Sequence, residues 1–166
     1  MIAIRIRDLS RASLVLAALL AGCGDHHDGS GAADTWTGMN DMLSGLALVD
    51  HGLAQYRASE RPVAVHDMES GMWRMSQGLS AMRSGLGAMS EQMMSRCGGS
   101  RQAWMGPLEA SMGELRAGHA MMTDSAATND ADGLARMDKA RRSAGDAMSV
   151  MSVAMSCMAH DSRGCD

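Results

Sequence analysis

The chain has 166 residues and a formal net charge of −4 at pH 7, and it contains 19 methionines but no phenylalanine. Its acidic balance excludes the basic surface that nucleic-acid-binding domains use, so we expect no nucleic-acid partner. Its length suits one domain behind a short leader.

Residues 1–22 predict an export signal, in which a positively charged start precedes the apolar run SLVLAALLAG. That run has about ten residues, half of what a membrane-spanning helix needs. It ends in Leu20-Ala21-Gly22-Cys23, which resembles the lipobox of bacterial lipoproteins. The resemblance implies cleavage before Cys23 and a lipid anchor on this cysteine. An ordinary secretory signal with a chance cysteine is the alternative.

The residue after Cys23 is Gly24, and not the aspartate that retains such lipoproteins at the inner membrane. The resemblance therefore implies an outer-membrane lipoprotein that faces the periplasm and has the membrane as its partner, with an unknown envelope protein as a further candidate. Residues 23–34, CGDHHDGSGAAD, predict a flexible tether. His26 and His27 beside the tether aspartates could hold a divalent ion loosely, but a solvated linker is the favoured interpretation.

From residue 35 onward, apolar residues recur with alternating spacings of three and four, which is the pattern of packed helices. Glu60-Arg61-Pro62, residues 97–100 and residues 123–132 separate four such runs, and the second run continues unbroken to Met93. We therefore predict an all-α, antiparallel up-down-up-down four-helix bundle over residues 35–160, with a Met/Leu core and a tail of residues 161–166.

A stripe of small residues accompanies the core pattern. Glycine inside a helix costs about 1 kcal/mol relative to alanine, so this stripe needs an offsetting gain. We predict that it lets antiparallel helices approach closely, with methionine side chains filling the remaining space. The stripe consists of Gly38, Gly45, Gly52, Gly71, Gly78, Gly85, Ser111, Gly118, Gly133, Ala140, Ala147 and Ala154.

Three cysteines follow the lipobox: Cys97, Cys157 and Cys165. An exported protein meets an oxidising compartment, so one disulfide is expected. Antiparallel register puts Cys97 level with about Met155, which favours Cys157 as its partner. Cys165 is the alternative partner, and a chain without either disulfide is the third interpretation.

The methionine stripe has two interpretations. It is a core built from a flexible apolar residue, or part of it is a Cu(I) site, because soft thioethers select this ion. The register brings together Met89, Met93, Met105, Met151 and Met155 as the candidate ligands. The core interpretation is favoured.

His119 is the one histidine predicted at a core position, level with Met137. A histidine opposite a methionine in a bundle resembles the haem bundles of the cytochrome b type, in architecture only. The small-residue stripe leaves little room for a porphyrin, so a buried histidine bonded to a neighbour is favoured over haem.

The sequence shows no nucleophile elbow, phosphate-binding glycine loop or paired-carboxylate motif. We therefore expect a non-catalytic binding or structural protein of the cell envelope, with no cofactor. Copper handling is the first alternative, and haem-based electron transfer is the second.

Overall fold

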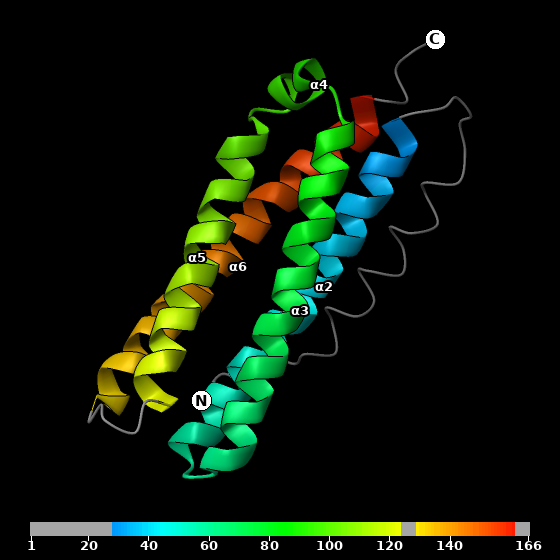
Figure 1. Ribbon diagram of the computed structural model, residues 1–166. Helices are drawn as coiled ribbons and strands as arrows, with labels where there is room; N and C mark the ends of the chain where they lie inside the picture. Colours follow the sequence, from blue (N-terminus) through cyan, green and yellow to red (C-terminus); the bar gives the residue numbers. More distant parts are fainter. Residues whose placement is uncertain (1–27, 124–128, 162–166) are drawn as a thin grey trace, which may run out of the picture.

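The computed structural model describes residues 28–123 and 129–161, with residues 28–30 and 160–161 described by their helical backbone alone. Five α-helices fill these ranges: α2 (Asp28–Arg57), α3 (Arg61–Ala88), α4 (Glu91–Arg96), α5 (Arg101–Thr123) and α6 (Asp130–Asp161) (Figure 1). The described residues contain no strand. The predicted all-α bundle is therefore confirmed at the level of fold class.

The helices are arranged as two hairpins. α2 packs along α3, and α5 packs along α6, while α3 also faces α5 and α2 also faces α6. Figure 1 shows the short α4 at the end of the molecule where α3 passes over to α5. Each hairpin is thus a unit, and the two units meet along the α3–α5 and α2–α6 seams.

Two predicted boundaries are wrong. α2 begins at Asp28, so residues 28–34 belong to a helix and not to a flexible tether. The second predicted helix does not continue to Met93, because Met89 is extended (φ −87°, ψ 149°) and α3 ends at Ala88. The Ser90 side chain then accepts a hydrogen bond from the Met93 backbone N–H, which caps α4 as a separate helix.

The turn between α2 and α3 is short and has defined chemistry. Ser59 adopts φ 74°, which reverses the chain after α2. Pro62 then lies in the first turn of α3, where its missing N–H costs no hydrogen bond. The result is a tight connection between the antiparallel helices α2 and α3.

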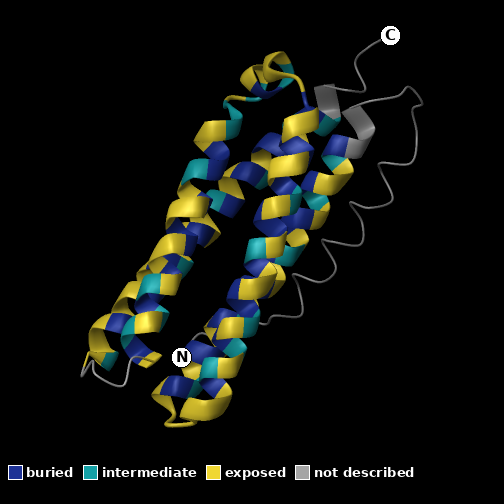
Figure 2. Ribbon diagram, viewed as in Figure 1, coloured by how far each residue is buried: buried dark blue, intermediate teal, exposed yellow. Residues whose placement is uncertain are grey.

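Methionine supplies most of the core. Sixteen methionines and six leucines are buried, and they form one continuous cluster along the inner faces of the helices. Figure 2 shows these buried positions as stripes along each helix, with exposed residues on the outer faces. Met42, Met68, Met75, Met82, Met137 and Met151 are completely inaccessible to solvent.

The small-residue stripe lies at the contact within each hairpin. A Cβ built on Gly45 would lie 2.5 Å from the Gly71 carbonyl oxygen, and one on Gly38 would lie 2.5 Å from the Gly78 carbonyl oxygen. Gly118 and Gly133 play the same part between α5 and α6, where a Cβ on Gly118 would lie 2.9 Å from the Gly133 carbonyl oxygen. The predicted close approach of antiparallel helices is therefore confirmed.

Methionines of the opposite helix cover these glycines, as predicted. A Cβ built on each of three glycines would lie only 2.5 to 2.7 Å from the Cγ atom of a methionine on the opposite helix. The pairs are Gly38 with Met82, Gly45 with Met75, and Gly118 with Met137. The dispersion attraction between such closely packed helices offsets the helix-propensity cost of glycine. Within the described ranges, none of the helices is both long and apolar enough to cross a membrane.

Candidate functional site: the groove between α3 and α5

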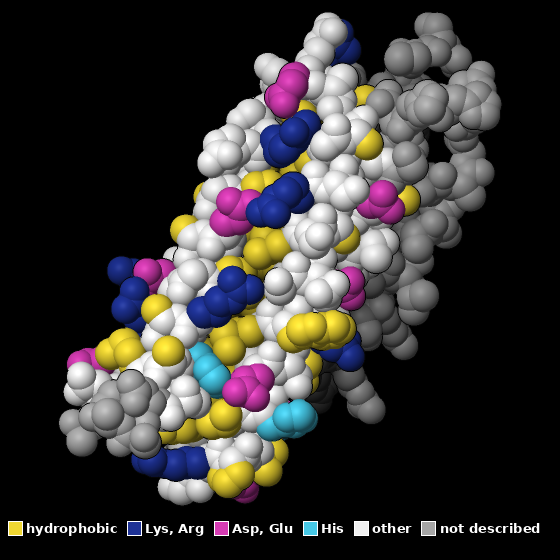
Figure 3. Space-filling model, in the orientation of Figure 1, with side chains coloured by type: hydrophobic (Ala, Val, Ile, Leu, Met, Phe, Trp, Pro, Cys, Tyr) yellow, Lys and Arg dark blue, Asp and Glu magenta, His cyan; other side chains and the backbone are white. Residues whose placement is uncertain are grey.

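The two hairpins leave a groove of about 520 Å³ along the α3–α5 seam. Ser76, Leu79, Ser80 and Arg83 line it from α3, and Glu109, Met112 and Arg116 line it from α5. Figure 3 shows apolar side chains at the bottom of this seam, with basic side chains in a line above them. The groove is open to solvent, and six of its eight lining residues are polar or charged.

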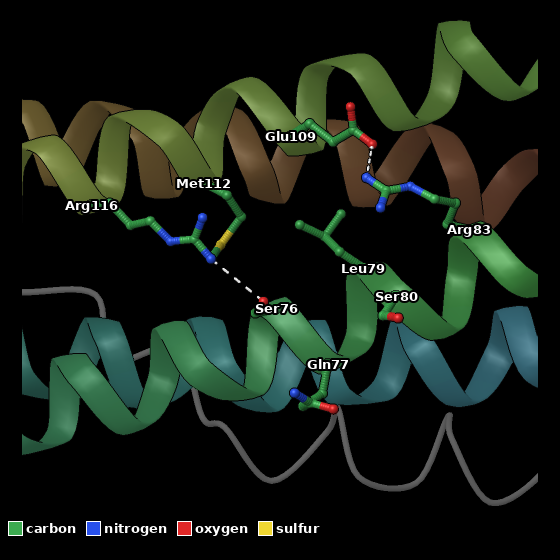
Figure 4. Close-up of a pocket in the computed structure, with 8 residues that line it drawn as sticks. All are labelled: Ser76, Gln77, Leu79, Ser80, Arg83, Glu109, Met112 and Arg116. Atoms are coloured by element: carbon green, nitrogen blue, oxygen red, sulfur yellow. Dashed lines mark hydrogen bonds and ion pairs between the residues drawn. The ribbon is translucent and has the colours of Figure 1, made fainter.

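An apolar strip occupies the middle of the groove. Leu79 points from α3 toward α5, and Met112 points back toward α3, whereas Gln77 points away from α5 (Figure 4). Leu79 is 8% exposed and Met112 is 2% exposed, so both belong to the bundle core. The groove therefore exposes little apolar surface, and polar side chains form most of its wall.

The two ends of the groove differ in charge. At one end, the Arg83 guanidinium donates to Glu109 Oε1 at 2.6 Å. At the other end, the Arg116 guanidinium donates to Ser76 Oγ at 3.4 Å (Figure 4). The Arg83 guanidinium has a carboxylate partner, whereas the contact of Arg116 among the described residues is one long hydrogen bond to a neutral hydroxyl.

Two further contacts cross the same seam outside the groove. Arg101 donates to the Leu86 carbonyl oxygen at 3.1 Å, close to the C-terminus of α3, where a cation is favoured by the helix dipole. His119 Nε2 lies 3.8 Å from Glu69 Oε1, and its side chain is 12% exposed. The α3–α5 seam is thus held by the apolar core below and by polar side chains above.

Burial lowers the pKa of His119, and the nearby Glu69 carboxylate opposes this shift in part. The Nε2 atom is buried and has no hydrogen-bond partner. His119 therefore lies half-buried at the α3–α5 seam beside an acidic neighbour, and the predicted hydrogen bond to a neighbour is not found at its Nε2. Among the described residues, no three His, Cys, Asp or Glu side chains gather in a way that could hold a metal ion.

The five candidate copper ligands all lie in or against the main core. Met89, Met105, Met151 and Met155 are at most 4% exposed, and Met93 is partly buried against the core. α4, which carries Met93, packs against α6, which carries Met151 and Met155. This end of the bundle is accordingly rich in thioether sulfur.

Cys97 and Cys157 form a disulfide, with Cα atoms 5.7 Å apart. This is the pairing that the sequence register favoured. Cys97 ends α4 and Cys157 lies on α6, so the bond ties the α4–α5 connection to α6. Cys23, Cys165, His26 and His27 lie outside the described residues.

Sequence reasoning missed the α3–α5 groove. Arg83, Glu109 and Arg116 are exposed residues on outward positions, which a heptad assignment treats as solvated. The available signal was spacing, because Ser76 and Arg83 are one heptad apart, as are Glu109 and Arg116. Comparison with known proteins adds nothing to this geometry, since no family model, no curated protein and no solved structure matches the chain.

Proposed function

We propose that the chain is an exported, lipid-anchored binding module of the cell envelope, and that the α3–α5 groove is its binding site. The observation that supports this proposal is the groove itself, where the Ser80 side chain and Arg116, which has no carboxylate within 4 Å in the described part of the chain, line the same space. Polar groups that converge on one concave surface and keep free donors are the groups that orient ligands in binding sites.

The proposal includes the finer architecture. α2, α3, α5 and α6 form an up-down-up-down four-helix bundle, with α4 as part of the connection between α3 and α5. Lipid on Cys23 holds this bundle at the periplasmic face of the outer membrane. The function is binding and not catalysis, because the groove presents a satisfied ion pair, hydroxyls and one cation without a nucleophile beside a base.

Ligand content tests the binding function. The Ser80→Trp variant fills the groove from an exposed position, and Ser143→Trp adds the same side chain to an exposed position on α6. We expect the wild-type chain and Ser143→Trp, purified from envelopes under native conditions, to release the same small molecule on denaturation. Ser80→Trp should lack it. A molecule present equally in all three preparations, or in none, contradicts the proposal.

Lipidation is tested separately. We expect radioactive palmitate to label the wild-type chain and the Cys165→Ser variant, and to leave Cys23→Ser unlabelled and released from the membrane fraction. Labelling of Cys23→Ser would show that the anchor is wrong while leaving the groove untouched.

Copper handling is the second candidate, and the thioether-rich end of the bundle favours it. Met93 is the partly exposed member of that group, and the helix that carries it packs against α6, which carries Met151 and Met155. Thioethers are soft donors that suit Cu(I). Anaerobic Cu(I) titration against a competing chelator tests this candidate, with Met93→Leu as the variant and the partly exposed Met121→Leu as the matched control. Equal affinity in both variants and the wild type contradicts it.

A further inference from the structure

The break between α3 and α4 falls where the sequence is suited to one continuous helix. Seven of the nine residues from 88 to 96 are Ala, Met, Glu, Gln or Arg, which are good helix formers, and none is Gly or Pro. Leu86, Met89 and Met93 also keep the spacing of three and four that marks the core face of α3. The local sequence therefore favours a helix from α3 through α4, and contacts from elsewhere in the fold must impose the break.

Burial beyond the break differs from what a continuous helix would give. Met93, which continues the core spacing of α3, is partly exposed, whereas its neighbour Met94 is 0% exposed. Successive residues of a helix differ in direction by about 100°, so α4 presents a different face to the core than it would as an extension of α3. Figure 1 shows α4 lying across the end of the bundle. α4 thus buries a residue that would lie off the core face of a continuous helix.

Arg101, the first residue of α5, contacts both sides of the break. Its guanidinium donates to the Leu86 carbonyl oxygen at 3.1 Å and lies 3.8 Å from Glu91 Oε1. In a continuous helix the Leu86 carbonyl would accept a hydrogen bond from the backbone N–H of Ser90, four residues further on. Arg101 therefore binds a carbonyl oxygen that continuation of α3 would use, and it stabilises the broken form.

The other contacts divide the chain into two units at this break. The disulfide joins Cys97, at the end of α4, to Cys157 on α6, so α4, α5 and α6 stay together if α3 and α4 become one helix. The α2–α3 hairpin is held by its own glycine contacts. Core side chains and ion pairs join the two units, and the ion pairs include Arg83–Glu109, Arg57–Asp138 and Arg141–Asp50. The same residues of another copy can supply all of these contacts.

We propose that Met89 and Ser90 form a hinge, and that the chain uses it to build a domain-swapped dimer. In the dimer, α3 and α4 of each copy make one continuous helix, and α5 and α6 of one copy pack against the α2–α3 hairpin of the other. The ion pairs between the units are regained, because both copies carry identical residues. The partner is thus a second copy of this chain, and Arg101 acts as the latch that favours the monomer.

Isotope mixing tests the exchange. Equal amounts of ¹⁴N- and ¹⁵N-labelled full chain carrying Arg83→Lys are unfolded without reductant, refolded together at high concentration and separated by size. A carbodiimide then couples the introduced amine to Glu109, the ion-pair partner of the native Arg83 at 2.6 Å. We expect the cross-linked peptide that joins positions 83 and 109 to combine both labels in the dimer fraction and to carry a single label in the monomer fraction.

Arg101→Gln tests the latch, with Arg83→Gln as its control. Loss of a charge-assisted hydrogen bond should favour opening of each hinge roughly tenfold, and the dimer contains two hinges, so its association constant should rise roughly a hundredfold. Arg83→Gln removes the same charge from an ion pair that both forms contain, so it should leave the association constant unchanged. Analytical ultracentrifugation after refolding at matched concentrations measures both.

Glu91→Pro tests the hinge in the opposite direction. Proline suits the first position of α4, and Ser90 already has the extended backbone (φ −73°, ψ 140°) that a residue before proline prefers. In a continuous helix this proline would remove a backbone hydrogen bond and clash with the preceding turn. We expect Glu91→Pro to stay monomeric where the wild type dimerises. Ser90→Ala, which removes the cap of α4, should dimerise more readily than the wild type.

Four outcomes overturn the inference. The first is that the wild type and Arg101→Gln both stay monomeric after refolding at high concentration. The second is a dimer whose 83–109 peptides each carry a single label, which would show side-by-side association without exchange. The third is dimerisation of Glu91→Pro to the same extent as the wild type, and the fourth is an equal rise in the association constant in Arg83→Gln and Arg101→Gln.

Discussion

Gly45 and Gly71 face each other across the α2–α3 contact, each occupying the space that a Cβ on the other would need. A Cβ on Gly45 would lie 2.5 Å from the Gly71 carbonyl oxygen, and a Cβ on Gly71 would lie 2.6 Å from the Gly45 carbonyl oxygen. Because the obstructing atoms belong to the backbone, a methyl group here must push two helices apart.

The first prediction concerns this contact. We expect Gly45→Ala to lower the free energy of unfolding by about 2–3 kcal/mol, since overpacking and helix separation outweigh the gain in helix propensity. Gly113→Ala is the matched control on α5, where a Cβ would meet nothing within 4 Å. It should raise stability by about 1 kcal/mol. Urea unfolding followed by circular dichroism measures both, and a stabilising Gly45→Ala would refute the packing account.

The second prediction concerns the disulfide. Cys97 and Cys157 are separated by 60 residues in sequence. A loop of this length implies that Cys97→Ser lowers the free energy of unfolding by about 4 kcal/mol, mainly because the unfolded chain becomes less constrained. Chemical denaturation of non-reduced protein measures the change. Cys165→Ser should leave the unfolding midpoint and the Cys97–Cys157 cross-linked peptide unchanged. A Cys97–Cys165 cross-linked peptide in the wild type that disappears in Cys165→Ser would instead assign the bond to Cys165.

The third prediction concerns His119. Burial lowers its pKa below the ordinary value of 6.5, with Glu69 acting in the opposite direction. The folded protein therefore binds this proton less readily than the unfolded chain, and stability falls as the pH drops from 6.5 toward the lower folded pKa. We expect His119→Gln to be less sensitive than the wild type to a change from pH 7.5 to 5.5 in thermal unfolding. His66→Gln, at an exposed histidine of α3, is the control and should keep the wild-type dependence. An unchanged slope in His119→Gln would refute this assignment.

The fourth prediction concerns Asp138, which joins α6 to α2. Although its burial raises the pKa, a hydrogen bond from Arg142 and the charges of Arg142, Arg57 and Arg141 outweigh it and lower the pKa of Asp138 below 3.8. The stabilisation from this carboxylate is present above pH 3.8 and is lost as the pH falls through the lower folded pKa.

We expect Asp138→Asn to lower the free energy of unfolding by about 1 kcal/mol at pH 7, and by less in 1 M salt. Asp146→Asn, at an exposed position of α6, is the control and should have no measurable effect. Urea unfolding at low and high salt distinguishes the two variants. Equal effects of Asp138→Asn at both salt concentrations would show that charge is not the cause.

Much of the fold could be predicted because the sequence repeats with the period of packed helices. Gly38, Gly45 and Gly52 recur every seven residues, and this spacing alone places them on one face and implies a close antiparallel neighbour. The same register favoured Cys157 as the partner of Cys97. These features are local patterns combined with a single assumption, that the connections are short.

The break at Met89 could not be predicted from periodicity, because Met89 and Met93 continue the spacing of α3. The sequence signal for this break is Ser90 followed by Glu91, which is a typical start of a helix even where the apolar spacing continues. The groove was missed for a different reason. The distances between Arg83 and Glu109, and between Arg116 and Ser76, depend on how the two hairpins are placed against each other, and no repeat within one helix specifies that placement.

The glycines between α2 and α3 recur every seven residues, and this regular spacing weakens the preference for one alignment of the two helices over another. Sliding one helix by seven residues would place Gly38 opposite Gly71, which is again a pair of glycines, and Gly45 opposite the small Ala64. The glycine spacing alone therefore permits several alignments of similar energy, and contacts that do not repeat every seven residues select one of them. Those are the turn at Ser59, where a shift would require a longer connection, and the buried Thr35, whose hydroxyl donates to the Gly31 carbonyl oxygen at 2.8 Å and occupies the space beside Gly85. If seven residues were inserted at Ser59, the connection could span a shifted alignment of α2 and α3. The protein would then have two competing folded states in place of one.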